Sequence, residues 1–406
     1  MADAPSADLA ARGREAEHAA SLGSVEPDWL NEARDRAKER LGELELPTQK
    51  QKGWEFTDLS NLDVDAYADG IAKVQGLEAS SAATVIPLAE AATAHPELVR
   101  DHLGTVVPGT DIFTARNESR WRDGVLVHVP SGARLEQPLR LTVSAEAGTE
   151  VNWRVLIVLE EGAEAEVWER YASDGEALFN GVVELVVGDG ANLRYVCEQE
   201  LSEQSWVFAT QRAEVGRDAN LDWVALGFGS ANGKVHLETR LAGPGSHAKV
   251  TGAYATQGRQ HVDFDTLQVH AAPNTTSDLA FRGIIDGRSS AVWSGMIKVD
   301  PGAQQTDAFQ DSRNLLLSKK AHADAIPGLE ILANDVRCTH AAAIAQIDQD
   351  QLFYLRSRGL QESVATRLVI EGFLAELVER LAEGPIREAV AGALEARMAE
   401  VLGVGA

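Results

Sequence analysis

The pair Cys338 and His340 is the clearest combination of chemically capable residues in this 406-residue chain. If the segment is a β-strand, residues two apart lie on the same face, with Cα atoms about 6.6 Å apart. A thiolate and an imidazole placed in this way could both reach one soft metal ion or one iron of a cluster. The preceding Arg337 could favour the thiolate form of the cysteine. Two ligands are too few for a cluster, so a site here needs ligands from a second chain. On the residues alone, a structural cysteine beside an incidental histidine stays open as the alternative.

A second candidate is the alternating run of His261, Asp263 and Asp265, which a strand would place on one face. Paired carboxylates there could do acid–base work, as in solenoid carbohydrate-active enzymes, or they could hold a metal ion. Acidic rows are also common on the solvent-exposed face of an acidic protein. We favour that simpler interpretation for this run.

Two further motifs have structural explanations. The run Gly227–Lys234 resembles a phosphate-binding loop, but Phe228 stands where the first glycine of that motif belongs. Val235 replaces the Ser or Thr that should follow the lysine, so we expect a turn without nucleotide. Cys197 lies in a strand-like run, where a lone cysteine is usually a small buried hydrophobe.

The composition excludes several classes of protein. With 37 Lys and Arg against 62 Asp and Glu, the formal net charge is −25, which disfavours binding to nucleic acid or to anionic membranes. Two cysteines cannot form a disulfide framework. We find no apolar run of transmembrane length and no secretory signal at the N-terminus, so we expect a cytoplasmic protein.

A repeated turn organises the middle of the chain. Small-residue turns followed by strand-like runs recur at Ala133, Ala163, Ala191, Ala219 and Ser246, with steps of 30, 28, 28 and 27 residues. A unit of this length holds two or three short strands and cannot bury its own apolar face, so the units should stack. The repeat therefore predicts a mainly β protein built on a β-solenoid, with an evenly spaced β-sandwich as the alternative.

The helical period appears on both sides of this stretch. It predicts helices over residues 26–46 and about 88–103 before the repeat, and over 360–381 and 386–402 after it, with Gly384 and Pro385 between the last two. We expect an N-terminal mainly helical domain (1–120), a β-solenoid core (121–350) and a C-terminal helical domain (351–406). The end helices would cap the open edges of the solenoid.

The C-terminal third resembles the SufB/SufD scaffold proteins of iron–sulfur cluster assembly. The residues that carry the resemblance are Phe281–Gly283, Gly302–Ala308, Asn314–Ser318, Pro327–Ile331, Asp335–His340 and Gln351–Gly359, and near the N-terminus Trp29–Leu30, Leu46–Thr48 and Trp54–Leu59. The length of the chain and the Cys-x-His form after Asp335 and Val336 favour the SufD branch. Ala341 departs from the glycine often found after this histidine, and Gly53 departs from the acidic residue often found before Trp54.

The resemblance implies a right-handed parallel β-helix between helical end domains, in a non-catalytic scaffold subunit. Such chains pair with a SufB-like paralogue through their β-helix ends, where Cys338 and His340 would lie. His340 would be the ligand or proton handler for a transient iron–sulfur cluster shared with the partner, and Cys338 its helper. The C-terminal helices would dock a SufC-like ABC ATPase through an apolar stripe of Leu360, Val364, Leu368, Phe373 and Leu377.

The resemblance also implies more distant partners. A cysteine desulfurase and its relay protein would deliver sulfur to the complex, and reduced flavin is associated with such complexes, although no flavin site is assignable in this sequence. The isolated chain could be a homodimer. The alternatives are a SufB-like scaffold that acts unaided as a homodimer and, more distantly, a carbohydrate-active enzyme that uses Asp263 and Asp265.

Overall fold

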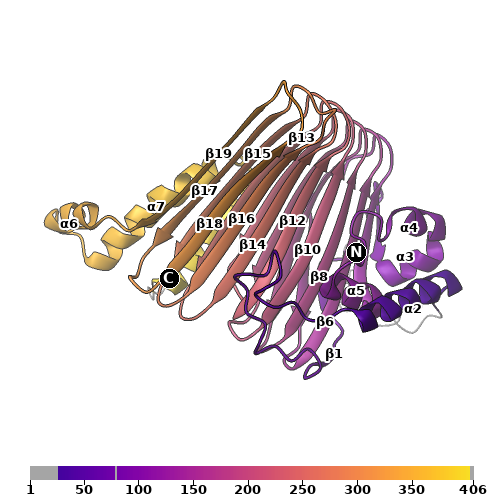
Figure 1. Ribbon diagram of the computed structural model, residues 1–406, viewed down its shortest axis with the longest axis horizontal. Coiled ribbons are helices and arrows are strands. Elements are labelled where there is room, and N and C mark those ends of the chain that lie inside the picture. Colours follow the sequence, from indigo (N-terminus) through magenta and orange to yellow (C-terminus); the bar gives the residue numbers. More distant parts are fainter. Residues whose placement is uncertain (1–25, 78–79, 403–406) are drawn as a thin grey trace, which may run out of the picture.

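The computed structural model describes residues 26–77 and 80–402, which form a two-sheet parallel β-solenoid with helices at both ends of the chain (Figure 1). The predicted end domains extend into residues 1–25 and 403–406, which lie outside the described residues. The prediction of a solenoid is confirmed. In the described part of the chain, no helix has both the length and the apolar character needed to cross a membrane.

Each coil of the solenoid contributes one strand to each of two sheets. The first sheet contains β3 (Thr84–Pro87), β4 (Asp123–Val129), β6 (Thr149–Leu159), β8 (Leu178–Val187), β10 (Trp206–Val215), β12 (Asn232–Leu241), β14 (His261–His270), β16 (Ser290–Val299) and β18 (His322–Ile331), with β1 (Ala68–Asp69) beside β6. The second sheet contains β2 (Lys73–Gln75), β5 (Leu139–Ala145), β7 (Glu164–Ser173), β9 (Asn192–Glu200), β11 (Asn220–Gly227), β13 (His247–Thr256), β15 (Thr276–Ile285), β17 (Asp307–Leu316) and β19 (Arg337–Gln346). From β4 onward, neighbouring strands within each sheet run parallel.

The repeated turn of the sequence is the corner where the first sheet passes into the second. One residue of each corner adopts the left-handed backbone conformation that favours Gly, Asn and Asp, as at Gly162 (φ 68°), Gly190 (φ 66°) and Asp218 (φ 53°). The N–H of each such residue donates to a carbonyl of the next coil, as from Gly190 to Arg217 at 2.7 Å. The corners therefore stack in register, and this is why the turn residues recur every 27 to 30 positions.

The space between the two sheets is the main hydrophobic core. It holds mostly aliphatic side chains and the fully buried indoles of Trp153, Trp223 and Trp293. Ala163 and Ala191, from the repeated turns, are completely buried at its edge because each faces the equivalent small residue of the next coil.

The N-terminal helices cover the outer face of the first sheet near its start. They are α2 (Asp28–Glu43), α3 (Leu88–Ala94), α4 (Pro96–His102) and α5 (Ile112–Arg120). Residues 88–103, expected as one helix, form two, because Pro96 restricts the residue before it and has no N–H to donate. Buried carboxylates hold this layer on the sheet: Arg116 of α5 lies 2.6 Å from Glu150, and Glu184 accepts a hydrogen bond from the Gly104 N–H at 2.9 Å.

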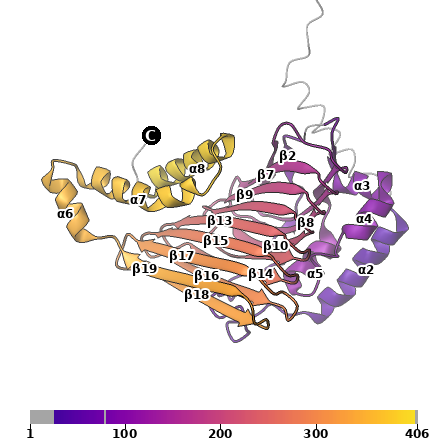
Figure 2. The same cartoon turned by 90° about the horizontal axis from the view of Figure 1, so that it is seen from above.

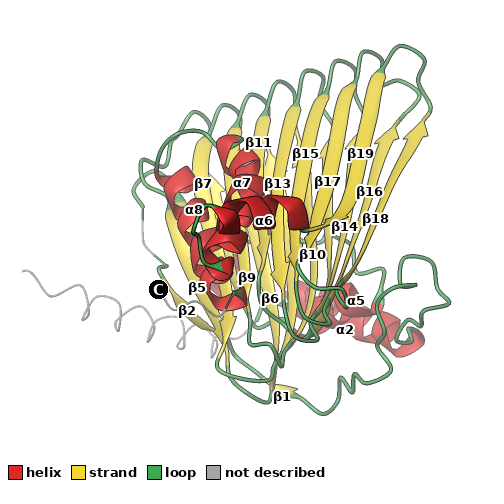
Figure 3. Ribbon diagram, turned by 90° about the vertical axis from the view of Figure 1, so that its left-hand side faces the viewer, coloured by secondary structure: helices red, strands yellow, loops and turns green. Residues whose placement is uncertain are grey.

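The last two C-terminal helices lie on the outer face of the second sheet, and the first projects beyond it (Figures 2 and 3). They are α6 (Gln349–Ser357), α7 (Glu362–Glu379) and α8 (Pro385–Val401). Leu374 and Leu377 of α7 and Leu394 of α8 pack with Leu226 and Ile284 of the sheet. The expectation that these helices cap the end of the solenoid is wrong, because outward-facing apolar residues of β11 to β17 draw them onto the face of the sheet. The last strands, β18 and β19, keep a free edge.

Candidate functional site

Cys338 and His340 lie on β19, the last strand of the second sheet and part of the open end of the solenoid. Cys338 is in register with Ala308 of β17, and His340 is in register with Gln310. Both partners on β17 are buried between the sheets, so the Cβ atoms of Cys338 and His340 lie on the inner face of the final coil. The structure therefore brings the two predicted ligands to one face of one strand.

The half-buried thiol of Cys338 packs at the end of a small apolar cluster that includes Ile297, Ala303 and Ala308. Burial and the nearby Asp307 carboxylate raise the pKa of this thiol above its ordinary value. The expectation that Arg337 favours the thiolate is wrong. Consecutive residues of a strand face opposite sides, and the position of Arg337 lies on the outer face, in register with Asp307.

The side chain of His340 is exposed, whereas the strand next to it, β17, is tied to the first sheet. The Gln310 side chain is fully buried, and its Nε2 donates to the carbonyls of Gly295 and Gly328, at 3.2 Å each. These two bonds join the second sheet to β16 and β18 of the first. His340 is thus an exposed imidazole on the last strand, and the neighbouring strand β17 is fixed by the hydrogen bonds of Gln310.

The open end of the solenoid around β19 has exposed apolar side chains as well as unpaired strand edges. Ile326, Ile331, Leu332 and Ile344 of the last coil are 39 to 53% exposed. Within residues 26–77 and 80–402, no group of three or more His, Cys, Asp or Glu side chains is placed to hold a metal ion.

The run His261, Asp263 and Asp265 lies on the outer face of the first sheet, on β14. Asp263 is buried, 2.7 Å from Lys234 Nζ, and accepts a hydrogen bond from Thr57 Oγ1 at 2.7 Å. Asp265 lies 3.1 Å from His236 Nδ1. Asp263 is thus committed to holding residues 54–58 against the sheet, and it is not free for acid–base work on a polysaccharide.

The other two motifs have the structural roles expected of them. Residues 227–234 include the turn between β11 and β12, and Lys234 is engaged by Asp263. Cys197 is buried, with Gln211 Nε2 3.3 Å from its sulfur, and burial raises the pKa of the thiol to about 12.

The apolar stripe of the C-terminal helices divides into two faces. Leu377 is completely buried against the sheet, and Leu360 and Phe373 are partly buried against the same cluster. Val364 and Leu368 are 43 and 45% exposed. Phe353 and Tyr354 of α6 are still more exposed, at 74 and 57%. The sequence interpretation missed this pair, although four consecutive apolar residues (352–355) cannot all face inward on a nine-residue helix.

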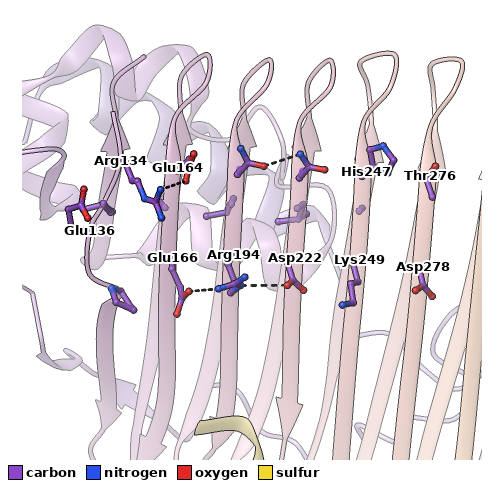
Figure 4. A pocket seen from close by; sticks show the side chains of 18 residues that line it. Arg134, Glu136, Glu164, Glu166, Arg194, Asp222, His247, Lys249, Thr276 and Asp278 are labelled. Atoms are coloured by element: carbon purple, nitrogen blue, oxygen red, sulfur yellow. Dashed lines mark hydrogen bonds and ion pairs between the residues drawn. The ribbon is translucent and has the colours of Figure 1, made fainter. Parts of the chain in front are cut away.

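A groove of about 520 Å³ crosses the outer face of the second sheet (Figure 4). Its side chains alternate in charge from strand to strand, with Arg194 2.7 Å from Glu166 and 3.5 Å from Asp222. Asn220 likewise donates to Asn192 at 2.9 Å. These side chains pair across neighbouring strands, so the row is explained as cross-strand stabilisation of the sheet.

Comparison with known proteins gives consistent matches over most of the chain. Residues 141–373 match the family model described as "SUF system FeS cluster assembly, SufBD core domain", and residues 65–141 match that of the "SufBD protein N-terminal region". An iron–sulfur cluster assembly SufBD family protein of Mycobacterium tuberculosis is 31% identical over 364 residues, which cover 87% of this chain and 89% of that protein. The iron–sulfur cluster assembly protein SufD of Bacillus subtilis is 29% identical over 416 residues, covering 92 and 95% of the two chains.

Proposed function

This chain belongs to the SufBD family of iron–sulfur cluster assembly proteins, and from that premise we propose that it is a SufD-like, non-catalytic scaffold subunit. It would pair with a SufB-like paralogue, dock a SufC-like ABC ATPase and hold a nascent cluster as cargo. The observation that carries this proposal is the unpaired end of the solenoid, where Cys338 and His340 lie on one face of the last strand beside exposed apolar residues.

The SufB-like partner would add its own strands to the free edges of β18 and β19. Each edge is a parallel strand of ten residues, and strand addition supplies main-chain hydrogen bonds. The exposed residues Ile326, Ile331 and Ile344 would be buried in the same contact. His340 would then lie between the two chains as a ligand or proton handler, and Cys338 would contribute as a neutral thiol.

The ATPase would dock on the exposed face of the C-terminal helices. Val364, Leu368, Phe353 and Tyr354 form the solvent-facing part of that surface, and Leu360 and Phe373 border it. Leu377 supports this surface from below by fixing α7 on the sheet. A cysteine desulfurase and its relay protein would supply sulfur to the assembled complex, which we place in the cytoplasm. Reduced flavin would act at the level of the complex, at a site that we do not assign.

The proposal is tested by cluster assembly in the reconstituted complex. The chain is co-purified with its SufB-like and SufC-like partners, supplied anaerobically with iron and sulfide, and assayed for iron per complex and for cluster absorbance. His340→Ala should lower the cluster yield severalfold while the complex stays intact. Thr339→Ala, on the outer face of the same strand, is the matched control. Equal yields for the two variants would contradict the assignment of His340.

The self-sufficient homodimeric scaffold is the second candidate, because the open end could also accept a second copy of this chain. The two candidates differ when the chain is reconstituted alone. A SufD-like subunit should retain little iron, since Cys338 and His340 of one chain cannot saturate a cluster. A stable, stoichiometric cluster on the isolated homodimer would favour the second candidate.

A further inference from the structure

Four basic residues lie on the corners where the second sheet passes into the first, in the half of the solenoid that leads to the free end. Arg259 lies between β13 and β14, Arg288 lies between β15 and β16, and Lys319 and Lys320 lie between β17 and β18. All four are exposed, and their side chains form no ion pair or hydrogen bond with any described residue. They form a cationic surface on a chain whose formal net charge is −25.

Three of the four residues occupy the same position of successive corners and form a column. The N–H of Arg288 donates to the Gly258 carbonyl at 2.8 Å, and Ser318 Oγ donates to the Gly287 carbonyl at 2.6 Å. These hydrogen bonds stack the corners directly on one another, at the spacing of about 4.8 Å that separates neighbouring strands. The residues that follow the stacked turn positions are Arg259, Arg288 and Lys319.

Elsewhere, this molecule places opposite charges next to each other across neighbouring strands. Arg212 lies 3.0 Å from Glu238, and Lys298 lies 3.7 Å from Glu330. Five of the nine lysines have a carboxylate or a carbonyl oxygen as partner. A column of like charges departs from this pattern and is unfavourable by itself, and such a departure is expected at a functional surface. The lysines without a partner among the described residues are Lys50, Lys52, Lys319 and Lys320.

Protection of the free edge does not explain the whole column. Lysines beside an exposed strand discourage unwanted strand pairing, and Lys319 and Lys320 directly precede β18, whose edge is free. Arg259 and Arg288, however, directly precede β14 and β16. Each of these two strands is paired on both sides, so it has no edge to protect.

The carboxylates near these corners do not neutralise the column. Glu203 Oε1 accepts a hydrogen bond from Gln257 Nε2 at 2.6 Å, and Asp324 lies 3.0 Å from His322. Asp286 lies in the same corner as Arg288, but among the described residues it forms no ion pair. The cations of the column therefore face solvent, where a carboxylate from another molecule can reach them.

We propose that this column binds an acidic segment of another protein, with carboxylates spaced about 5 Å apart. Side chains at positions i and i+4 of a helix lie about 5–6 Å apart, which matches the spacing of successive corners. Nucleic acid is the less suitable anion, because the column is only about 10 Å long and the net charge of −25 repels a polyphosphate chain. The surface goes beyond the proposed scaffold function, since it involves neither β19 nor the C-terminal helices.

Affinity labelling of the full-length chain tests the proposal. A hexaglutamate peptide that carries one amine-reactive ester is added at low ionic strength, and mass spectrometry measures the labelled fraction of each lysine. Lys319 and Lys320 should be labelled severalfold more than Lys50 and Lys52, which are also exposed and unpaired. The excess should disappear in about 0.5 M NaCl, which screens the column, and with a hexaserine peptide that carries the same ester. Equal labelling of the four lysines by hexaglutamate would refute the proposal.

Variants that keep the two corner lysines show whether the arginines belong to the site. The double variant Arg259→Gln/Arg288→Gln should lose most of the excess labelling. Arg217→Gln/Arg240→Gln is the matched control, because it changes the net charge equally at exposed positions near the opposite end of the strands. Thermal unfolding shows that each variant is folded. An equal loss of labelling in the two double variants would overturn the site, and stronger labelling by an oligonucleotide with the same ester would overturn the assignment to a protein segment.

Discussion

His270 is a polar side chain inside the solenoid whose two ring nitrogens both have partners. His270 is completely buried, with Nδ1 2.7 Å from Thr275 Oγ1 and Nε2 2.9 Å from Ser277 Oγ. Because Thr275 Oγ1 donates to the Ala272 carbonyl, Nδ1 of the ring donates to Thr275, and the uncharged ring accepts at Nε2 from Ser277. This is the neutral imidazole, and burial lowers the pKa of His270 to about 4. The folded protein therefore resists protonation here.

Acid should destabilise the protein through this residue. The pKa of His270 in the folded state, about 4, lies below its ordinary value of 6.5, so this contribution to stability is present above pH 6.5 and is lost as the pH falls towards 4. The loss amounts to about 3 kcal/mol at most. In chemical denaturation measured from pH 7 to pH 4, the free energy of unfolding of the His270→Gln variant should lack this part of the decline. His322→Gln, at an exposed position, controls for loss of an imidazole, and identical pH slopes for the two variants would count against the argument.

The candidate site could be predicted from the sequence only where its residues are neighbours in the chain. Cys338 and His340 are two apart, and the period of a strand alone puts them on one face. Residues 54–58, in contrast, meet β14 only through contacts such as the hydrogen bond from Thr57 to Asp263, which is far away in the sequence. No local spacing carries that information. The protonation of Cys338 was also missed, since it depends on Asp307 and on burial.

At the scale of the element, the helical period predicted where the C-terminal helices lie but not which side of each faces the sheet. The helix α7 has apolar residues on more than one side, so Leu368 and Leu377 look alike in the sequence. The structure separates them, because Leu377 is fully buried and Leu368 is 45% exposed. Which side of α7 is buried depends on the row of apolar residues on the outer face of the second sheet. That row is assembled from residues of separate coils.

The two leucines should respond differently to the same change. Leu377→Asp buries a charge and should lower the free energy of unfolding by about 3 kcal/mol or more. Leu368→Asp should change it by only about 0.5 kcal/mol, yet weaken docking of the SufC-like ATPase about tenfold. Calorimetric unfolding and a binding titration with the ATPase measure the two effects. Full-strength docking by a folded Leu368→Asp variant would remove this face from the proposed interface.

At the scale of the whole molecule, the repeat of 27 to 30 residues predicted the stacked architecture. The prediction succeeded because each corner needs a residue, such as Gly190 or Asp218, that accepts the left-handed conformation. A residue of this kind therefore recurs from coil to coil. The repeat does not show where stacking stops. The return of the helical period does show where the solenoid ends, but not that β18 and β19 keep a free edge, because the helices that follow pack on the face of the second sheet and not over its end.

Hydrogen exchange should detect that free edge. Amides of β19 that point away from β17 have no neighbouring strand, so they should exchange faster than those of central strands such as β10. Mass spectrometry of peptides from β18 and β19 should show slower exchange once the SufB-like partner is bound. Unchanged exchange in a complex that has formed would mean that the partner binds elsewhere.

The two ends of the solenoid are not alike, and this difference limits how many other chains can pair with its strand edges. At the start of the stack, the first sheet ends in β3, four residues long with Pro87 in it, and the second ends in β2, three residues long. Both run antiparallel to their neighbours, and such short edges resist strand addition. The chain can therefore be extended at one end only. Within the described part of the chain, two solenoids that meet there would leave no further long edge, so we expect association to end at a pair and not to continue into a fibre.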